Sequence, residues 1–299
     1  MRRLLSNGNQ LVVRAKGQQR GPGAALGALG ADAAPAAGVR SISDIKIVAY
    51  GDSITAAGKW ESFLRTATGA NTVNMGVGGD STHTALPRFK NVLAAKPEIV
   101  FIAFGTNDAA IDMDKYTPLE KYRELLGKYI DECRAAGAQV IVMTPPPVDD
   151  VKYLTRHDEE PFKPYGGPNG LVAIYAAAAR EVAAERKVLC CDINAAFSAK
   201  PNCASLLSDG VHPTDAGYKL YAETVRKSLS LLLLGDIDLD MELTANDYLY
   251  AKRAVLGTAD LPADALARAD ADGNGKVDAN DYLYIKRAVL GTYDLKKGN

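Results

Sequence analysis

The middle of the chain alternates short apolar runs with longer amphipathic stretches. The apolar runs are bounded by turn-forming residues, which is typical of buried strands. We expect five strands, at Ile45–Tyr50, Asn71–Met75, Ile99–Phe104, Gln139–Thr144 and Val188–Ile193. A helical period marks the stretches Trp60–Ala67, Leu119–Ala136, Leu171–Lys187 and Ala216–Leu232. This alternation predicts a parallel α/β sheet with helices on both faces and with its chemistry in loops beyond the carboxyl ends of the strands.

Both ends of the chain depart from that pattern. Residues 1–43 are rich in Gly and Ala without a sustained apolar period, so we expect a disordered basic leader. Residues 234–299 contain a repeat, in which Asp247–Thr258 recurs 34 residues later as Asp281–Thr292 with 11 of 12 positions identical. We therefore expect three parts: the leader 1–43, an α/β domain 44–233 and a duplicated small module 234–299.

Composition narrows the possible functions. The 35 basic and 36 acidic residues give a net charge of −1, which argues against a nucleic-acid binder. Charge is nevertheless uneven, at +5 in residues 1–40 and −4 in residues 234–299. No apolar run is long enough to span a membrane. The four cysteines are too few for a disulfide scaffold, although a Cys191–Cys203 disulfide stays open for an exported protein.

The basic leader leaves the export route open. Ala24–Ala31 is a weak and late apolar segment, so it is not a convincing signal peptide. The alternatives are an export signal, a transit peptide, and a tail or misplaced start codon.

Polar groups suited to acyl transfer follow the predicted strands. A serine hydroxyl needs a base to become a nucleophile, and His212 is the natural base for Ser53. Asp209, three residues before that histidine, can hold the other ring nitrogen. The backbone N–H groups of Ser53 and Gly79 and the side-chain amide of Asn107 are candidate oxyanion donors. These residues lie in four blocks, Gly51–Thr55, Asn74–Asp80, Gly105–Asp108 and Asp209–Pro213.

Simpler interpretations exist for the same residues. Ser53 alone could be a helix-capping serine. We expect Asp52 and Asp108 to hold loops and not to react. His83 is expected on a helix surface and His157 in a solvated loop, because charged residues surround it.

The four blocks, in this order and spacing, resemble the SGNH (GDSL) hydrolase family over roughly residues 44–233. The resemblance implies a flavodoxin-like three-layer α/β/α sandwich with five parallel strands. It also implies that Ser53 is the nucleophile, that Asp209 and His212 complete a triad, and that Ser53, Gly79 and Asn107 stabilise the oxyanion. The family name GDSL denotes the motif Gly-Asp-Ser-Leu, and this chain has Ile54 in place of the leucine.

The residues before each repeated helix have the spacing of calcium loops. Loop one is residues 236–247 and loop two is residues 270–281, with oxygen-bearing side chains at positions 1, 3, 5, 9 and 12. Hard oxygen donors at this spacing wrap around one cation, with a final carboxylate closing the sphere. Position 12 is Asp in place of the usual Glu.

These loops and helices resemble a cellulosomal type I dockerin, a small all-α module with two EF-hand-like loop–helix repeats. The resemblance implies two structural Ca²⁺ ions, held by Asp236, Asp238, Asp240, Glu242, Thr244, Asp247, Asp270, Asp272, Asn274, Lys276, Asp278 and Asp281. It implies a cohesin surface at Ala245, Asn246, Lys252, Arg253, Ala279, Asn280, Lys286 and Arg287. The departure is Met241 at position 6 of loop one, where loop two keeps Gly275.

Together, the two resemblances imply an extracellular serine esterase attached to a cellulosome. Its substrate would be an acylated plant cell-wall polysaccharide or oligosaccharide, as for an acetylxylan esterase, and catalysis would need no cofactor. One alternative is a lysophospholipase-like or general short-chain esterase. Another is a catalytically silent, calcium-dependent adaptor. Cohesin would be the protein partner, with no nucleic acid or membrane involved.

Overall fold

The computed structural model describes residues 42–238, 240, 242–293 and 295. Most of the predicted leader lies outside the described residues, and its last two positions belong to a 3₁₀ helix, Ile42–Asp44. The chain divides into two compact units, of which the first is Ile45–Ser228. The second contains the chain from Leu229 onward, so the division falls a few residues before the predicted boundary at 233.

A five-stranded parallel sheet forms the centre of the first unit, in the order β2-β1-β3-β4-β5. Its strands are β1 (Ile47–Gly51), β2 (Thr72–Gly76), β3 (Ile99–Ala103), β4 (Gln139–Met143) and β5 (Leu189–Cys191). The predicted fold class and all five strands are confirmed. The last strand is shorter than expected because Asp192 leaves it to cap the next helix, accepting the N–H of Ala195.

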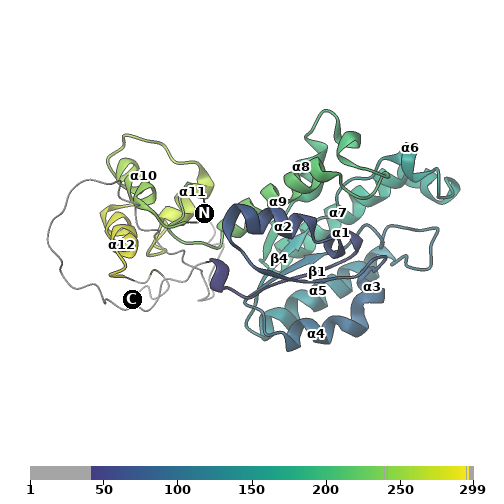
Figure 1. Cartoon of the computed structure of the whole chain (residues 1–299), viewed down its shortest axis with the longest axis horizontal. Helices are drawn as coiled ribbons and strands as arrows, with labels where there is room; N and C mark the ends of the chain where they lie inside the picture. The colour runs from purple at the N-terminus through teal and green to yellow at the C-terminus, as the bar shows by residue number, and fades with distance from the viewer. Residues whose placement is uncertain (1–41, 239, 241, 294, 296–299) are drawn as a thin grey trace. The chain divides into compact units, whose positions relative to one another are not determined.

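Helices lie on both sides of the sheet (Figure 1). Alternate strand residues point to opposite faces of the sheet and so pack against two helical layers. On one face, Val48 and Val100 join a buried cluster with Phe89 and Tyr129 from the helices below. On the other face, Trp60 packs edge-on to Phe101, with ring centres 5.7 Å apart. The helices of the first face are α3 (Thr82–Ala85), α4 (Phe89–Ala94), α5 (Leu119–Ala135) and α7 (Pro168–Glu185), and α2 (Lys59–Thr68) and α9 (Asp215–Ser230) cover the second.

The sequence did not predict the bounds of three short helices between β2 and β3, although His83 was expected on a helix surface. They are α3, the 3₁₀ helix η2 (Leu86–Arg88) and α4. Each is too short to display a helical apolar period, and Pro87 interrupts the pattern between them. The remaining short elements are α1 (Ser53–Ala56), α6 (Asp150–Tyr153), η3 (Glu160–Tyr165), α8 (Ile193–Ser198) and η4 (Cys203–Leu206). The four cysteines are free, so the optional disulfide does not form in this structure.

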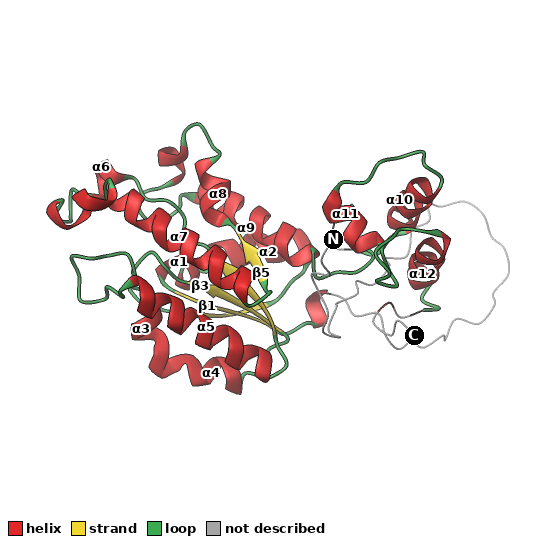
Figure 2. Ribbon diagram, turned by 180° about the vertical axis from the view of Figure 1, so that it is seen from behind, coloured by secondary structure: helices red, strands yellow, loops and turns green. Residues whose placement is uncertain are grey.

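In the described residues after Ser230, the second unit forms the helices labelled α10, α11 and α12 in Figure 2. They are α10 (Ala245–Val255), α11 (Ala263–Ala269) and α12 (Ala279–Val289). The repeated helices α10 and α12 pack against each other, and Tyr248 and Tyr282 meet at 6.3 Å between ring centres. No helix in the described part of the chain is long and apolar enough to cross a bilayer.

Candidate active site and calcium loops

Ser53 begins a helix directly beyond the carboxyl end of β1. Asp52 caps this helix, α1, by accepting the N–H of Ile54 at 2.9 Å. The N–H of Ser53 therefore lies in the first turn, where helical N–H groups have no intrahelical partner. Strand β1 lies between β2 and β3, so Ser53 stands where the strand order reverses, the position at which open α/β sheets bind ligands.

Two hydrogen bonds join Ser53, His212 and Asp209 in a chain. The Oγ of Ser53 lies 2.8 Å from Nε2 of His212, and Nδ1 of His212 lies 2.8 Å from Oδ2 of Asp209. An ionised carboxylate only accepts hydrogen bonds, so Nδ1 carries the proton and Nε2 is left to accept from the serine. The structure thus brings together the three residues predicted for the triad, in an arrangement able to remove the serine proton.

The turn that carries Asp209 and His212 keeps the carboxylate charged. Burial disfavours the charge, but the backbone N–H and ring of His212 and the N–H of Val211 all donate to this carboxylate. The hydrogen bonds prevail and hold the pKa of Asp209 well below its usual range. Gly210 completes the turn with a φ of +93°, and a Cβ there would lie 2.7 Å from the Cβ of Lys152. Only glycine fits this position.

Residues 149–156, in the segment after β4, donate hydrogen bonds to carbonyl groups in and next to the turn that carries Asp209 and His212. The N–H of Asp149 donates to the carbonyl of Gly210 at 2.8 Å. Arg156 donates to the carbonyl of Asp209 at 2.7 Å, and Lys152 donates to that of Leu207 at 3.0 Å. These contacts fix the base and its carboxylate partner relative to the sheet.

The turn that carries Gly79 lies beside the nucleophile, and Asn107 is hydrogen-bonded to the residue after that turn. A Cβ at Gly78 would be 4.0 Å from the Cβ of Ser53, which places the Gly78–Gly79 turn at the serine. Gly79 has a φ of +82°, and a Cβ there would meet no heavy atom within 4 Å, so its backbone faces open space. The side chain of Asn107 is buried and donates from Nδ2 to the carbonyl of Asp80 at 2.8 Å. Its second Nδ2 hydrogen is left for another acceptor.

Arg88 clamps the strand ends beneath this site, and the sequence reasoning missed it. Its guanidinium donates to the carbonyls of Gly51 at 2.9 Å and Met75 at 2.5 Å. It also donates to the carboxylate of Asp80 at 2.6 Å and lies over the ring of Tyr50. One side chain therefore links the end of β1, the end of β2 and the residue after Gly79.

Asp52 and Asp108 hold loops, as predicted. Both are buried. Asp108 accepts from the N–H and hydroxyl of Thr82 and from the N–H of Gly105. Burial raises the pKa of Asp52 to about 7 and that of Asp108 to about 6. Neither lies in the hydrogen-bonded chain of Ser53.

The two other histidines, His83 and His157, differ in their exposure to solvent. His83 is exposed on α3, as expected. The expectation of a solvated loop for His157 is wrong, because its side chain is only 13% exposed. Its Nδ1 lies 2.8 Å from the carboxylate of Asp112, and its ring stacks on Tyr153 at 4.0 Å. The charged neighbours in sequence concealed a partner 45 residues away.

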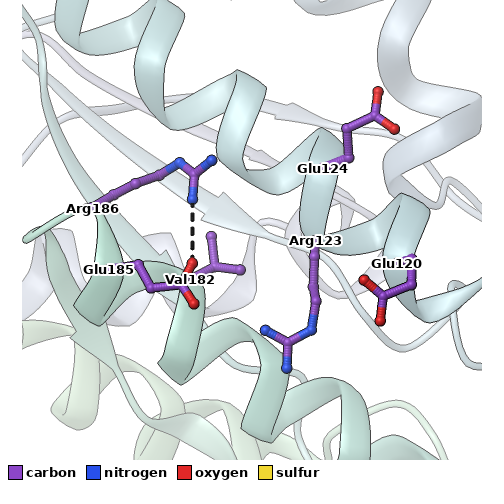
Figure 3. Close-up of a pocket in the computed structure, with 6 residues that line it drawn as sticks. All are labelled: Glu120, Arg123, Glu124, Val182, Glu185 and Arg186. Atoms are coloured by element: carbon purple, nitrogen blue, oxygen red, sulfur yellow. Dashed lines mark ion pairs between the residues drawn. The ribbon is translucent and has the colours of Figure 1, made fainter.

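Figure 3 shows a hollow on the surface of the first unit. It is lined by Glu120, Arg123, Glu124, Val182, Glu185 and Arg186, from α5, α7 and the residue after α7. Its charges pair locally, since Arg186 contacts both Glu185 and Asp131 and Arg123 contacts Glu181. None of the residues predicted for catalysis lines it, so we assign it no substrate.

In the second unit, carboxylates gather in each predicted calcium loop. Oxygen atoms of Asp236, Asp238 and Asp240 lie within 4.8 Å of one another. In loop two, Asp270, Asp272 and Asp281, at positions 1, 3 and 12, form a second group of this kind. Three carboxylates this close repel one another unless a cation lies between them, and oxygen donors suit Ca²⁺. The residues present therefore fit the ion. Met241 lies outside the described residues.

The other loop residues take supporting positions. The position-12 carboxylate Asp247 is buried and accepts the N–H groups of Ile237 and Thr244. Burial, with the charges of Asp238 and Asp240, raises its pKa to about 7. Two predicted ligands, Thr244 and Asp278, cap α10 and α12. The N–H groups of Glu242 and Lys276 donate to the position-5 side chains Asp240 and Asn274.

The residues expected to contact cohesin lie on α10 and α12. Seven of them are exposed and the eighth, Lys286, is half-buried. The exposed set is Ala245, Asn246, Lys252, Arg253, Ala279, Asn280 and Arg287. The repeat thus presents the same residue types on both helices.

Comparison with known families agrees with the two resemblances. The model of the GDSL-like lipase/acylhydrolase family matches residues 49–220. The model of the dockerin type I domain matches residues 234–290. The two families expected from the sequence are confirmed, in the expected order.

Individual curated proteins resemble part of the chain. An uncharacterized lipoprotein, YqeF, of Bacillus subtilis is 36% identical over 143 residues, covering 40% of this chain and 59% of that protein. The isoamyl acetate-hydrolyzing esterase of Saccharomyces cerevisiae is 28% identical over 156 residues, covering 51% and 66%. The chain thus spans less than two thirds of the length of either curated relative.

Solved structures share the fold. A lipase/acylhydrolase from Enterococcus faecalis superposes with a TM-score of 0.53 at 28% identity, covering 60% of this chain and 93% of that one. An acetylxylan esterase from Geobacillus stearothermophilus gives a TM-score of 0.51 at 23% identity, covering 62% and 94%.

Proposed function

Because the chain belongs to the GDSL-like lipase/acylhydrolase family, we propose that it hydrolyses carboxylic esters with Ser53 as nucleophile. The observation that carries this proposal is the unbroken hydrogen-bonded chain from Ser53 through His212 to Asp209, with 2.8 Å at each link. A base aligned in this way on a serine hydroxyl, with a carboxylate behind it, is the arrangement that acyl transfer requires.

In the first half of the reaction, Ser53 Oγ attacks the acyl carbon while its proton moves to Nε2 of His212. The carbonyl oxygen becomes an oxyanion, which accepts hydrogen bonds from the N–H groups of Ser53 and Gly79 and from Nδ2 of Asn107. Asp209 stabilises the imidazolium without taking its proton. His212 then protonates the leaving alcohol oxygen as the ester bond breaks, and an acyl ester on Ser53 remains.

In the second half, water attacks the acyl carbon as His212 takes one of its protons. The same donors stabilise the second oxyanion. Collapse of this intermediate breaks the bond to Ser53 Oγ, which regains the proton from His212. The products are a carboxylic acid and a free alcohol, and the enzyme returns to its starting state.

We propose acetyl groups on plant cell-wall polysaccharide as the substrate. The dockerin-type region supports this choice, because such a module would bring the enzyme to a polysaccharide-degrading assembly. The yeast relative is named for hydrolysis of an acetate ester, and the Geobacillus protein of similar fold is an acetylxylan esterase. A second candidate substrate class, small acetate esters of volatile alcohols, is favoured by the name of the yeast relative alone.

A substrate panel separates these classes. Acetate release is measured from acetylated xylan, acetylated pectin, isoamyl acetate and a long-chain acyl ester, with wild-type protein and Ser53→Ala. We expect the polysaccharides to give the highest kcat/KM and the variant to release no acetate above background. A preference for isoamyl acetate or the long-chain ester would overturn the polysaccharide assignment. No turnover of any ester would favour a silent adaptor.

We further propose that residues 234–299 bind a cohesin in a Ca²⁺-dependent manner, attaching the enzyme to an extracellular cellulosome. The oxygen donors of loops one and two would hold one Ca²⁺ each, and the ions would fix the loops that begin α10 and α12. A panel of immobilised cohesins tests the partner directly. Binding to none of them in millimolar Ca²⁺ would contradict it.

A further inference from the structure

Lys115 touches the predicted oxyanion donor from the side opposite to Asp80. Its Nζ lies 2.7 Å from Oδ1 of Asn107, and the lysine is half-buried. Nδ2 of the same amide donates to the carbonyl of Asp80 at 2.8 Å. The buried side chain of Asn107 is therefore held at both of its polar atoms.

This pair of contacts permits only one orientation of the amide. An ammonium group donates and cannot accept, so it must face the amide oxygen. The carbonyl of Asp80 accepts and cannot donate, so it must face the amide nitrogen. Turning the amide of Asn107 by half a turn would place donor against donor and acceptor against acceptor. Lys115 and the backbone together fix the direction of the remaining Nδ2 hydrogen.

The loop that carries Lys115 is itself anchored on both sides. Before the lysine, the carboxylate of Asp112 contacts Nδ1 of His157 at 2.8 Å. After it, the carbonyl of Thr117 accepts from the hydroxyl of Tyr175 at 2.5 Å, and the N–H of Thr117 donates to the carbonyl of Asp108. The ammonium is thus placed by packed residues, as a positioning group requires.

We propose that Lys115 is a positioning residue, which orients the Asn107 amide toward the oxyanion and strengthens it as a donor. A cation on the amide oxygen draws electron density from the nitrogen, which makes Nδ2–H a better hydrogen-bond donor. This inference rests on the proposed function, because it needs Asn107 to stabilise an oxyanion. Lys115 itself contacts neither the acyl group nor the nucleophile in this scheme.

A double-mutant cycle tests the proposal with 4-nitrophenyl acetate as substrate. Asn107→Ala is expected to lower kcat by about 10²–10³-fold, the usual loss for one oxyanion donor. Lys115→Met is expected to lower kcat by roughly 10–100-fold with KM within about twofold, since the amide keeps its place but loses its orientation. The double variant should be no slower than Asn107→Ala alone, because the lysine acts through the asparagine. Lys115→Arg, which keeps a cationic donor, should restore part of the loss.

Matched variants separate this effect from general damage. Lys121→Met removes an exposed lysine whose contact is Glu124, and it should leave kcat unchanged. Circular dichroism must show each variant folded, and Lys115→Leu replaces Lys115→Met if the latter unfolds. Unchanged kcat in Lys115→Met, losses that multiply in the double variant, or an effect on KM alone would each overturn the role of Lys115. If Asn107→Ala keeps full activity, the proposed oxyanion role of Asn107 fails as well.

Discussion

Ser53 and His212 are separated by 159 positions in the sequence, yet Ser53 Oγ lies 2.8 Å from His212 Nε2. The serine follows the first strand, while the histidine precedes the last long helix of the same unit. Only the parallel sheet brings them together, because it directs the loops after its strands to one edge.

Asp209→Asn should lower kcat by about 10³–10⁴-fold with little effect on KM. The amide of the new side chain would donate to His212 Nδ1, so the ring would carry its proton on Nε2 and could not accept from Ser53. Steady-state kinetics on 4-nitrophenyl acetate measures the loss. Asp215→Asn is the control, since that exposed aspartate pairs with Lys59 and should not affect turnover. Equal losses in the two variants would argue against the assigned tautomer.

Arg88→Met should destabilise the fold and slow catalysis. The variant leaves two backbone carbonyls and the carboxylate of Asp80 without their cationic partner, and removing one member of a largely buried pair typically costs about 3–5 kcal/mol. Urea unfolding measures the free-energy change. Arg88→Lys should recover little of the loss, because an ammonium lacks the planar fork that reaches three acceptors. A fully stable Arg88→Met variant would contradict the clamp.

Glu61 should make the fold less stable as pH rises. Burial raises the pKa of Glu61 from its ordinary value of 4.5 to about 8. Folding therefore takes up a proton between these pH values, so the free energy of unfolding falls as pH increases from about 4.5 to about 8. Glu61→Gln stays neutral and can keep the hydrogen bond from Asn74.

The measurement is the free energy of unfolding at pH 5 and at pH 8. The difference in unfolding free energy between pH 5 and pH 8 should be smaller in Glu61→Gln than in the wild-type protein by roughly 2–4 kcal/mol. This range follows because one pKa unit corresponds to about 1.4 kcal/mol. Glu124→Gln, on an exposed glutamate, should leave the difference as it is in the wild-type protein. The same pH dependence in wild type and Glu61→Gln would show that Glu61 does not carry it.

Removal of Ca²⁺ should abolish cohesin binding but leave ester hydrolysis nearly unchanged. With excess chelator, the repulsion within the carboxylate groups of loops one and two is no longer offset, so α10 and α12 should lose their ordered starts and cohesin binding should disappear. Ester hydrolysis should change less than about twofold, because the triad lies in the other unit. Binding is measured by calorimetry and hydrolysis in the same samples. Undiminished cohesin binding in chelator would refute the calcium dependence.

The sequence predicted those parts of the site that depend on local patterns or on a family motif. Strand positions follow from apolar runs, and Asp209 and His212 lie three residues apart in one turn. The contacts that individual charged side chains make with the rest of the site were not predictable. Arginine and lysine usually lie on the protein surface, so the sequence does not single out Arg88 or Lys115. Only the folded chain shows that Arg88 contacts Gly51 and that Lys115 contacts Asn107.

The most direct measurement is the rate of 4-nitrophenyl acetate hydrolysis by wild-type protein and by Ser53→Ala at equal concentration. Our account predicts turnover by the wild-type protein and a loss of at least about 10³-fold in the variant, since the nucleophile forms the acyl intermediate. Hydrolysis at the wild-type rate by Ser53→Ala would contradict the claim that Ser53 carries the reaction.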